Sequence, residues 1–190
     1  GGLDGHFSVD GANATWSGID AKQLGGTLHL SREAGQKLAV EADLTAEAIR
    51  LSGGSAPLLD RVSATLRSAP DGYEIHAQLV SDKPQRATDL VFDSTANFAG
   101  DAPSGVFGIS GTALGEPIST ARPATWRLGD EPELDMQLAL LSGTITANLT
   151  GAGDDTRLVF DTKDVDLAPA LASFGEATKS TRLNGHGDLR

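Results

Sequence analysis

The sequence predicts an all-β fold, an elongated antiparallel sheet curled into an open groove or β-taco. Apolar and polar residues alternate over short runs, as they do in strands with one covered face and one wet face. Gly, Asp, Asn, Ser and Pro separate these runs, which is typical of antiparallel connections. Helical periodicity is almost absent, with at most one short helix near residues 168–174. We expect residues 1–190 to form one continuous segment whose apolar side has no helical cover.

The clearest element in the first half is a hairpin over residues 62–79. Val62, Ala64 and Leu66 alternate with polar residues, and the same pattern returns after residue 72. Pro70 and Gly72 favour the chain reversal, because Pro presets its φ and Gly accepts the left-handed conformation. Residues 38–44 alternate in the same way, and less regular runs predict strands at 7–16, 27–31, 88–98, 106–112 and 125–128.

The second half predicts three more strands and one short helix. Alternation over 134–140 and 145–149 is interrupted by Ser142-Gly143, and a turn over 151–155 leads to Leu158 and Phe160. Pro169 suits a first helical turn and Gly175 a helix stop, so a helix of about two turns is expected between them. Residues 101–105 and 115–123 are expected to be internal loops.

Charge and composition exclude some classes of protein. The chain has 15 Lys and Arg against 26 Asp and Glu, a net charge of −11, so it should repel nucleic acid. Only 5% of the residues are aromatic, which suits a thin or open apolar layer. The lack of cysteine excludes disulfides and thiolate metal sites, and is compatible with an oxidising space such as a periplasm. The start at Gly1-Gly2 without Met indicates a fragment of a longer protein.

No constellation of catalytic residues is apparent, and we expect neither an enzyme nor a cofactor. Nucleophilic catalysis needs a Ser or Cys beside a His that a carboxylate orients. The four histidines, at positions 6, 29, 76 and 186, share no motif. The sequence has no nucleophile elbow, phosphate-binding Gly loop or metalloprotease helix pair.

The densest acidic run contains ligands of the kind that calcium binds. Asp161, Asp164 and Asp166 follow Asp154 and Asp155, and calcium prefers several carboxylate oxygens. The spacing lacks the central Gly and terminal Glu of a calcium loop. We therefore interpret the run as a solvated acidic edge that discourages aggregation, and expect no metal ligand there.

The apolar side of the predicted sheet can be covered in three ways. The sheet can fold into a sandwich, wind into a solenoid, or form a trough that something else fills. Inward residues such as Ala42, Ala64, Ala77 and Ala147 are small for the interdigitation of a sandwich. A trough free of inward charge would shield acyl chains from water. Burial of apolar surface contributes a free energy of roughly 25 cal/mol per Å². The expected lipid-contact residues are Leu38, Val40, Leu44, Val62, Leu66, Ile75, Leu79, Phe92, Leu134, Met136, Leu138, Leu140, Ile145, Leu149, Leu158 and Phe160.

Several segments resemble the repeating units of the bacterial TamB and AsmA-like family. They are residues 134–151 (LDMQLALLSGTITANLTG), 164–171 (DVDLAPAL), 183–189 (LNGHGDL) and 111–118 (GTALGEPI), and the likeness covers most of residues 36–190. The resemblance implies a long periplasmic β-trough in a Gram-negative bacterium, anchored in the inner membrane by a helix elsewhere in the protein. It further implies phospholipid transport to the outer membrane, outer-membrane protein assembly and secretion, and a barrel partner that other segments bind.

Two alternatives stay open. The first is an extracellular adhesin or passenger-like β-solenoid, which would show a rung repeat of about 20–30 residues, and none is visible. The second is a carbohydrate-binding β-sandwich, which would expose Trp16 and Trp126 on one face.

Overall fold

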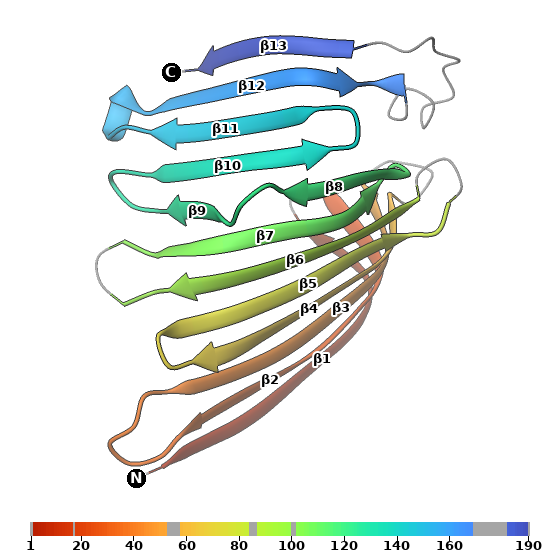
Figure 1. The fold of residues 1–190 in the computed structure, drawn as a ribbon. Coiled ribbons are helices and arrows are strands. Elements are labelled where there is room, and N and C mark those ends of the chain that lie inside the picture. Colours follow the sequence, from red (N-terminus) through yellow and green to blue (C-terminus); the bar gives the residue numbers. More distant parts are fainter. Residues whose placement is uncertain are drawn as a thin grey trace.

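The chain folds into one antiparallel sheet of thirteen strands (Figure 1). The computed structural model describes residues 2–16, 18–52, 58–83, 87–99, 102–168 and 182–189. The strands are β1 (Leu3–Trp16), β2 (Ile19–Arg32), β3 (Ala39–Leu51), β4 (Leu59–Ala69), β5 (Gly72–Ser81), β6 (Thr88–Asn97), β7 (Ser104–Ala113), β8 (Glu116–Thr120), β9 (Ala124–Arg127), β10 (Glu133–Leu140), β11 (Thr144–Thr150), β12 (Arg157–Asp166) and β13 (Arg182–Leu189).

The order of strands in the sheet follows the order in the chain. Each strand from β1 to β8 pairs with the next, and the path continues through β10, β11, β12 and β13. Strand β9 shares its place with β8, because both pair with β7 on one side and β10 on the other. The predicted all-β class and elongated antiparallel sheet are confirmed.

The predicted turns connect the strands as expected. Strands β4 and β5 pair from Arg61↔Val80 to Ala69↔Gly72, around the turn at Pro70. Gly72 has a φ of 151°, and a Cβ there would collide with the carbonyl oxygen of Ala96 on β6. Gly is therefore needed at this position both for the turn and for the close approach of β6. Between β11 and β12, Gly153–Asp155 form one 3₁₀ turn, η2.

The predicted loop at 115–123 is wrong over residues 116–120, which form β8. Pro117 suggested a loop, since it has no N–H for a ladder. It is tolerated because it pairs with Thr112 of β7, while β10 pairs with β8 only at 118–120. The loop predicted at 101–105 ends earlier than expected, because β7 already begins at Ser104. Apart from Ala168, the predicted helix at 168–174 lies outside the described residues.

Three residues other than glycine have a left-handed backbone conformation within the strands. Asn13 on β1 has a φ of 58° and Ala48 on β3 a φ of 49°, in strands that both pair with β2. Asp164 on β12, with a φ of 54°, marks a bulge where the pairing with β13 shifts register. Such bulges bend a strand and increase its twist.

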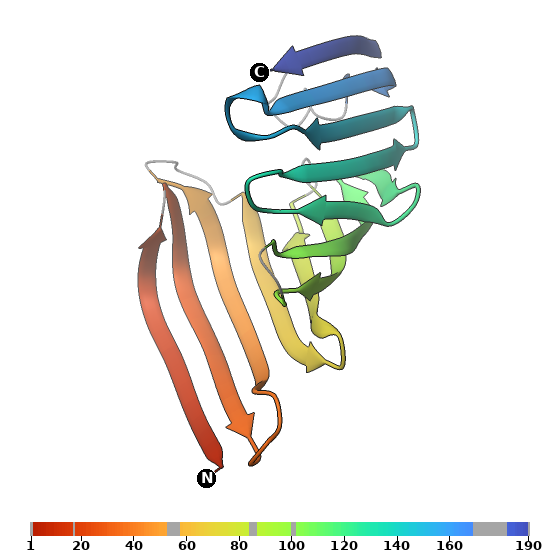
Figure 2. The ribbon, with the colours of Figure 1, turned by 90° about the vertical axis from the view of Figure 1, so that its left-hand side faces the viewer.

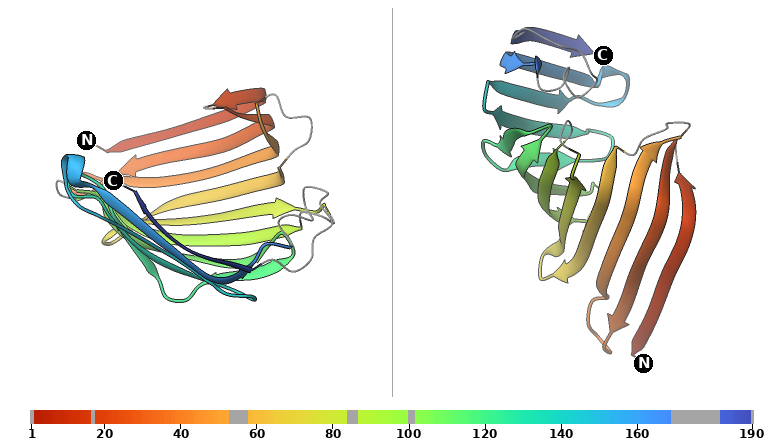
Figure 3. Two further views of the ribbon diagram at one scale, coloured as in Figure 1. Left: turned by 90° about the horizontal axis from the view of Figure 1, so that it is seen from above. Right: turned by 90° about the vertical axis from the view of Figure 1, so that its right-hand side faces the viewer.

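The sheet is a single strongly twisted layer. Figure 2 shows the N-terminal strands β1–β3 and the C-terminal strands β10–β13 running in clearly different directions. The two views of Figure 3 show no second sheet or helix packed on either side of the described strands. No large side chain of the described residues is fully buried. The described part also contains no helix with the length and apolar character needed to cross a membrane.

Candidate functional site

Strand register joins the apolar residues of neighbouring strands into one surface. A row of directly paired residues runs from β1 to β7, and consists of Phe7, Leu28, Ala42, Leu66, Ile75, Ser94 and Phe107. A second row crosses β9 to β13, and consists of Trp126, Leu134, Leu149, Leu158 and Leu189. Because side chains alternate along a strand, residues two apart from these join the same side of the sheet. We call this surface the apolar face.

Fifteen of the sixteen residues expected to contact lipid lie on the apolar face. They are Val40, Leu44, Val62, Leu66, Ile75, Leu79, Phe92, Leu134, Met136, Leu138, Leu140, Ile145, Leu149, Leu158 and Phe160. The sixteenth, Leu38, precedes β3 and lines a hollow with Tyr73 and Phe98 at one end of the strands. Register therefore brings nearly the whole predicted set together.

The expected lipid-contact set leaves out further apolar residues at both ends and in the middle of this face. They include Phe7, Leu28, Leu30, Tyr73, Leu90, Phe107, Ile109, Ile118 and Trp126. In β7 the alternation is disguised, because Gly105 and Gly111 replace apolar residues on the face and Val106 lies on the opposite side. The register of β7 with β6, in which Phe92 pairs with Ile109, is needed to place Phe107 and Ile109 on the apolar face.

The apolar face is sheltered but not covered. All five buried residues of the described chain lie on it: Ser81, Ser94, Ala96, Ala124 and Val165. Larger side chains on the same face stay open to solvent, with 60% of Phe7, 46% of Leu44 and 39% of Phe160 exposed. By alternation, the charged residues on this side lie toward the ends of strands, and are Asp20, Lys22, Arg32, Arg50, Asp60 and Glu116. The interior of the face is therefore aliphatic, uncharged and only partly buried.

Aromatic rings fill the spaces above glycines on this face. Gly105 pairs with Trp126, and a Cβ at Gly105 would lie 2.9 Å from the indole Nε1 and would also collide with the carbonyl oxygen of Thr95. In the same way the ring of Phe160 occupies the space where a Cβ of its partner Gly187 would stand. Phe92 and Phe107 stack with ring centroids 5.4 Å apart. Aromatic rings that cover glycines in this way help to fix the register of neighbouring strands.

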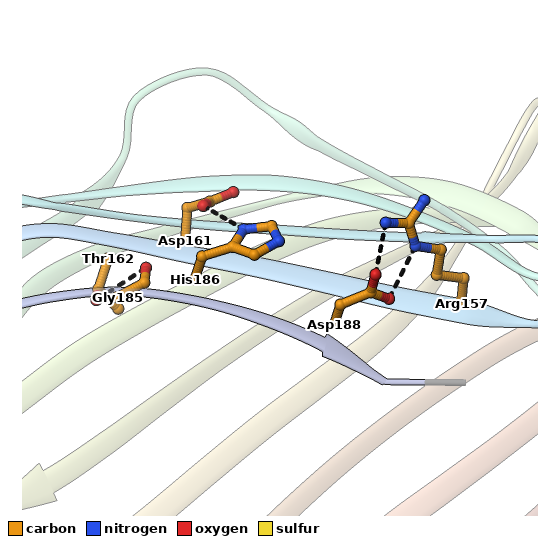
Figure 4. A network of polar contacts seen from close by, with 6 residues as sticks. All are labelled: Arg157, Asp161, Thr162, Gly185, His186 and Asp188. Atoms are coloured by element: carbon orange, nitrogen blue, oxygen red, sulfur yellow. Dashed lines mark hydrogen bonds and ion pairs between the residues drawn. The ribbon is translucent and has the colours of Figure 1, made fainter.

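The opposite side, the polar face, carries charges that are largely paired across strands. Figure 4 shows Arg157 of β12 donating two hydrogen bonds to Asp188 of β13, at 2.8 Å from Nε and 2.6 Å from Nη2. The carboxylate of Asp188 raises the pKa of Arg157 through these bonds. In the same figure His186 Nδ1 lies 2.7 Å from Asp161 Oδ1.

The acidic run considered for calcium is dispersed in the fold. Asp161 pairs with His186, the backbone N–H of Asp164 donates to Asn184 Oδ1, and Asp166 accepts from the N–H of Ala168. These residues do not form a cation-binding group among the described residues, because the one group with suitable geometry lies on β1 and β2.

The polar face is also hollowed. A depression of about 800 Å³ lies between β4–β7 and the segment that joins β8 to β9. Its lining includes Arg67, Glu74, His76, Asp93 and Arg122. Three of these are paired, since His76 Nδ1 lies 2.7 Å from Asp93 and Arg122 lies 2.5 Å from Asp135. A hollow of this polarity does not extend the apolar face and does not suit a hydrocarbon chain.

Comparison with known proteins gives this chain no relative. No family model, curated protein or solved structure matches it.

Proposed function

We propose that this chain is a non-enzymatic lipid-shielding segment whose apolar face binds acyl chains. The observation that supports this most is the continuous aliphatic face from β1 to β13, with no second layer over it among the described residues. Apolar surfaces larger than a few hundred Å² are uncommon on soluble proteins unless they bind something. A sandwich would require a second sheet here, and the described strands form one.

Hydrocarbon is the occupant whose chemistry fits this face. The face offers Leu, Val, Ile, Phe and small Ala and Gly side chains, and its interior carries no charge that an acyl chain would have to desolvate. Each methylene group removed from water contributes about 0.8 kcal/mol. A bound acyl chain would thus supply the burial that a second protein layer provides in a sandwich.

The wider role follows from the resemblance to TamB and AsmA-like proteins. Under this proposal the chain is a section of a periplasmic groove, and the whole protein is anchored in the inner membrane. It would support phospholipid transport to the outer membrane, outer-membrane protein assembly, or both, with a barrel protein contacted through other segments.

The proposal is tested by native mass spectrometry of the purified chain with two matched variants. Ala64 on the apolar face and Ser63 on the polar face are neighbours in β4, and both are half-buried. We expect phospholipid to remain bound to the wild type and to Ser63→Glu, and to be lost from Ala64→Glu. Circular dichroism would verify that both variants keep their strands. Equal lipid retention by the two variants, or no lipid on the wild type after mild extraction, would rule out the apolar face as the binding surface.

A further inference from the structure

We propose that Asp4, His6 and His29 form a binding site for a divalent transition-metal ion, for which Zn²⁺ is the probe. The three residues lie on the polar face of the β1–β2 hairpin. The site is thus on the opposite side of the sheet from the proposed lipid surface, and either proposal can fail without the other.

Strand register creates this group. His6 and His29 are directly paired across β1 and β2, although 22 other residues separate them in the chain. Asp4 precedes His6 by two positions, so its side chain emerges on the same side. Regular antiparallel pairing extends on both sides of the cluster, from Leu3↔Arg32 to Ala12↔Gln23. The ladder of β1 and β2 therefore continues in both directions along the strands from the cluster, and it fixes the backbone that carries the three side chains.

The ligand atoms converge at separations that suit a bound metal. His29 Nε2 lies 3.1 Å and His6 Nε2 3.5 Å from the same oxygen of Asp4, Oδ1. The three ligand atoms all lie within 4.8 Å of one another. In a tetrahedral site with bonds of about 2.0–2.1 Å, neighbouring ligand atoms are about 3.3 Å apart. One ion can therefore contact all three residues with small side-chain adjustments.

The two imidazole rings lie side by side. Their centroids are 4.0 Å apart and their planes are 7° from parallel. The stacking brings two imidazoles, the commonest metal ligands among side chains, to one place on the sheet.

A further carboxylate lies where a second layer of a metal site is usually found. Glu41 of β3 pairs with His29, and its Oε2 is 4.0 Å from His29 Nδ1, the nitrogen that faces away from Asp4. Metal-bound histidines commonly direct their other nitrogen to a carboxylate, which orients the ring. Asp4 and His6 side chains are 72% and 73% exposed, so water can complete the coordination.

Two imidazoles and one carboxylate select the class of ion. Imidazole ligands suit Zn²⁺, Cu²⁺ and Ni²⁺, whereas Ca²⁺ and Mg²⁺ prefer oxygen ligands. The other two histidines provide matched controls on the same polar face. His76 pairs with Asp93 and His186 with Asp161, each at 2.7 Å, and neither pair includes a second histidine.

Calorimetric titration of the 190-residue chain with Zn²⁺ tests the site. We expect saturable binding of one ion per chain, at least about tenfold weaker in His6→Ala, His29→Ala and Asp4→Asn, and unchanged in His76→Ala and His186→Ala. NMR of the imidazole protons should show shifts at His6 and His29, reversed by a chelator. The proposal would be overturned by absence of saturable Zn²⁺ binding to the wild type, by equal binding of Ca²⁺, or by binding that survives in both His6→Ala and His29→Ala. A loss of the same size in His76→Ala would also overturn it.

Discussion

Met136 on β10 lies directly opposite Ala147 on β11, and both belong to the apolar face. Its neighbour Gln137 pairs with Thr146 on the polar face. A single step along β10 thus moves a side chain from the proposed lipid surface to the opposite side of the sheet. The pair Met136 and Gln137 separates the two faces experimentally without any change of strand or depth.

A photo-crosslinking residue in place of Met136 or Leu138 should capture phospholipid in cells. The same residue in place of Gln137 should not, because its side chain leaves the sheet on the polar side. The measurement is mass spectrometry of the crosslinked product. Equal capture at positions 136 and 137 would contradict an acyl-chain surface confined to one face.

Gly105→Ala should destabilise the chain by about 1–3 kcal/mol. Its Cβ would meet the indole of Trp126 and the carbonyl oxygen of Thr95, and a backbone oxygen in a central ladder cannot move aside cheaply. Gly11→Ala is the control, since a Cβ there has no atom within 4 Å, and its effect should stay within about 0.5 kcal/mol. Urea unfolding of both variants provides the comparison. Equal midpoints would show that Gly105 is not constrained by Trp126 and Thr95.

Acid should weaken the fold partly through Asp20. Hydrogen bonds from Ser52 and Thr15, together with the charge of Arg50, hold the pKa of Asp20 below its ordinary value. A carboxyl with a lowered pKa in the folded state stabilises the fold above its unfolded pKa, and this contribution is lost as the pH falls through the folded value. Asp20→Asn should therefore lose less stability than the wild type between pH of about 5 and 2.

The variant Ser52→Ala checks the cause of this effect. Ser52 Oγ donates to Asp20 Oδ1 at 2.7 Å, so its removal should raise the pKa of Asp20. The measurement is an NMR titration of the Asp20 carboxyl. An unchanged pKa in Ser52→Ala would contradict the role of this hydroxyl.

Arg157→Lys should loosen the pairing of β13 with β12. Arg157 donates from two nitrogens to Asp188, and a lysine ammonium cannot reproduce this fork. Because the pair is exposed, the effect on global stability should be small. Hydrogen exchange of the β13 amides should become a few times faster, since an edge strand opens locally. Unchanged exchange in Arg157→Lys would show that the ion pair does not hold the edge.

The sequence was sufficient for the fold class and for most of the apolar face. In β4, β5, β10 and β11, apolar residues recur at every second position, and this period determines which side of a strand they occupy. Glycines obscured the same period in β7, where Gly105 and Gly111 occupy face positions at which the alternation would place apolar side chains. Pro117 obscured β8, because the effect of a proline depends on which neighbour its missing N–H would have faced.

The histidine cluster was beyond sequence reasoning for a different reason. His6 and His29 meet because β1 and β2 pair in one particular register, and a shift of one residue would place them on opposite faces. Local alternation predicts strands and faces, but the residue that stands opposite another is a property of the paired hairpin. A site assembled from two strands is therefore invisible until the register is known.

The agreement between strand order and chain order has a consequence for how this protein reaches its native state. Almost every strand finds its partner in the segment just before or after it, so the entropy lost on closing each loop is small. Proteins whose contacts are close in sequence fold faster than those with distant pairings, and β-proteins are usually among the slow ones. This chain can instead assemble hairpin by hairpin, each finished strand serving as the template for the next.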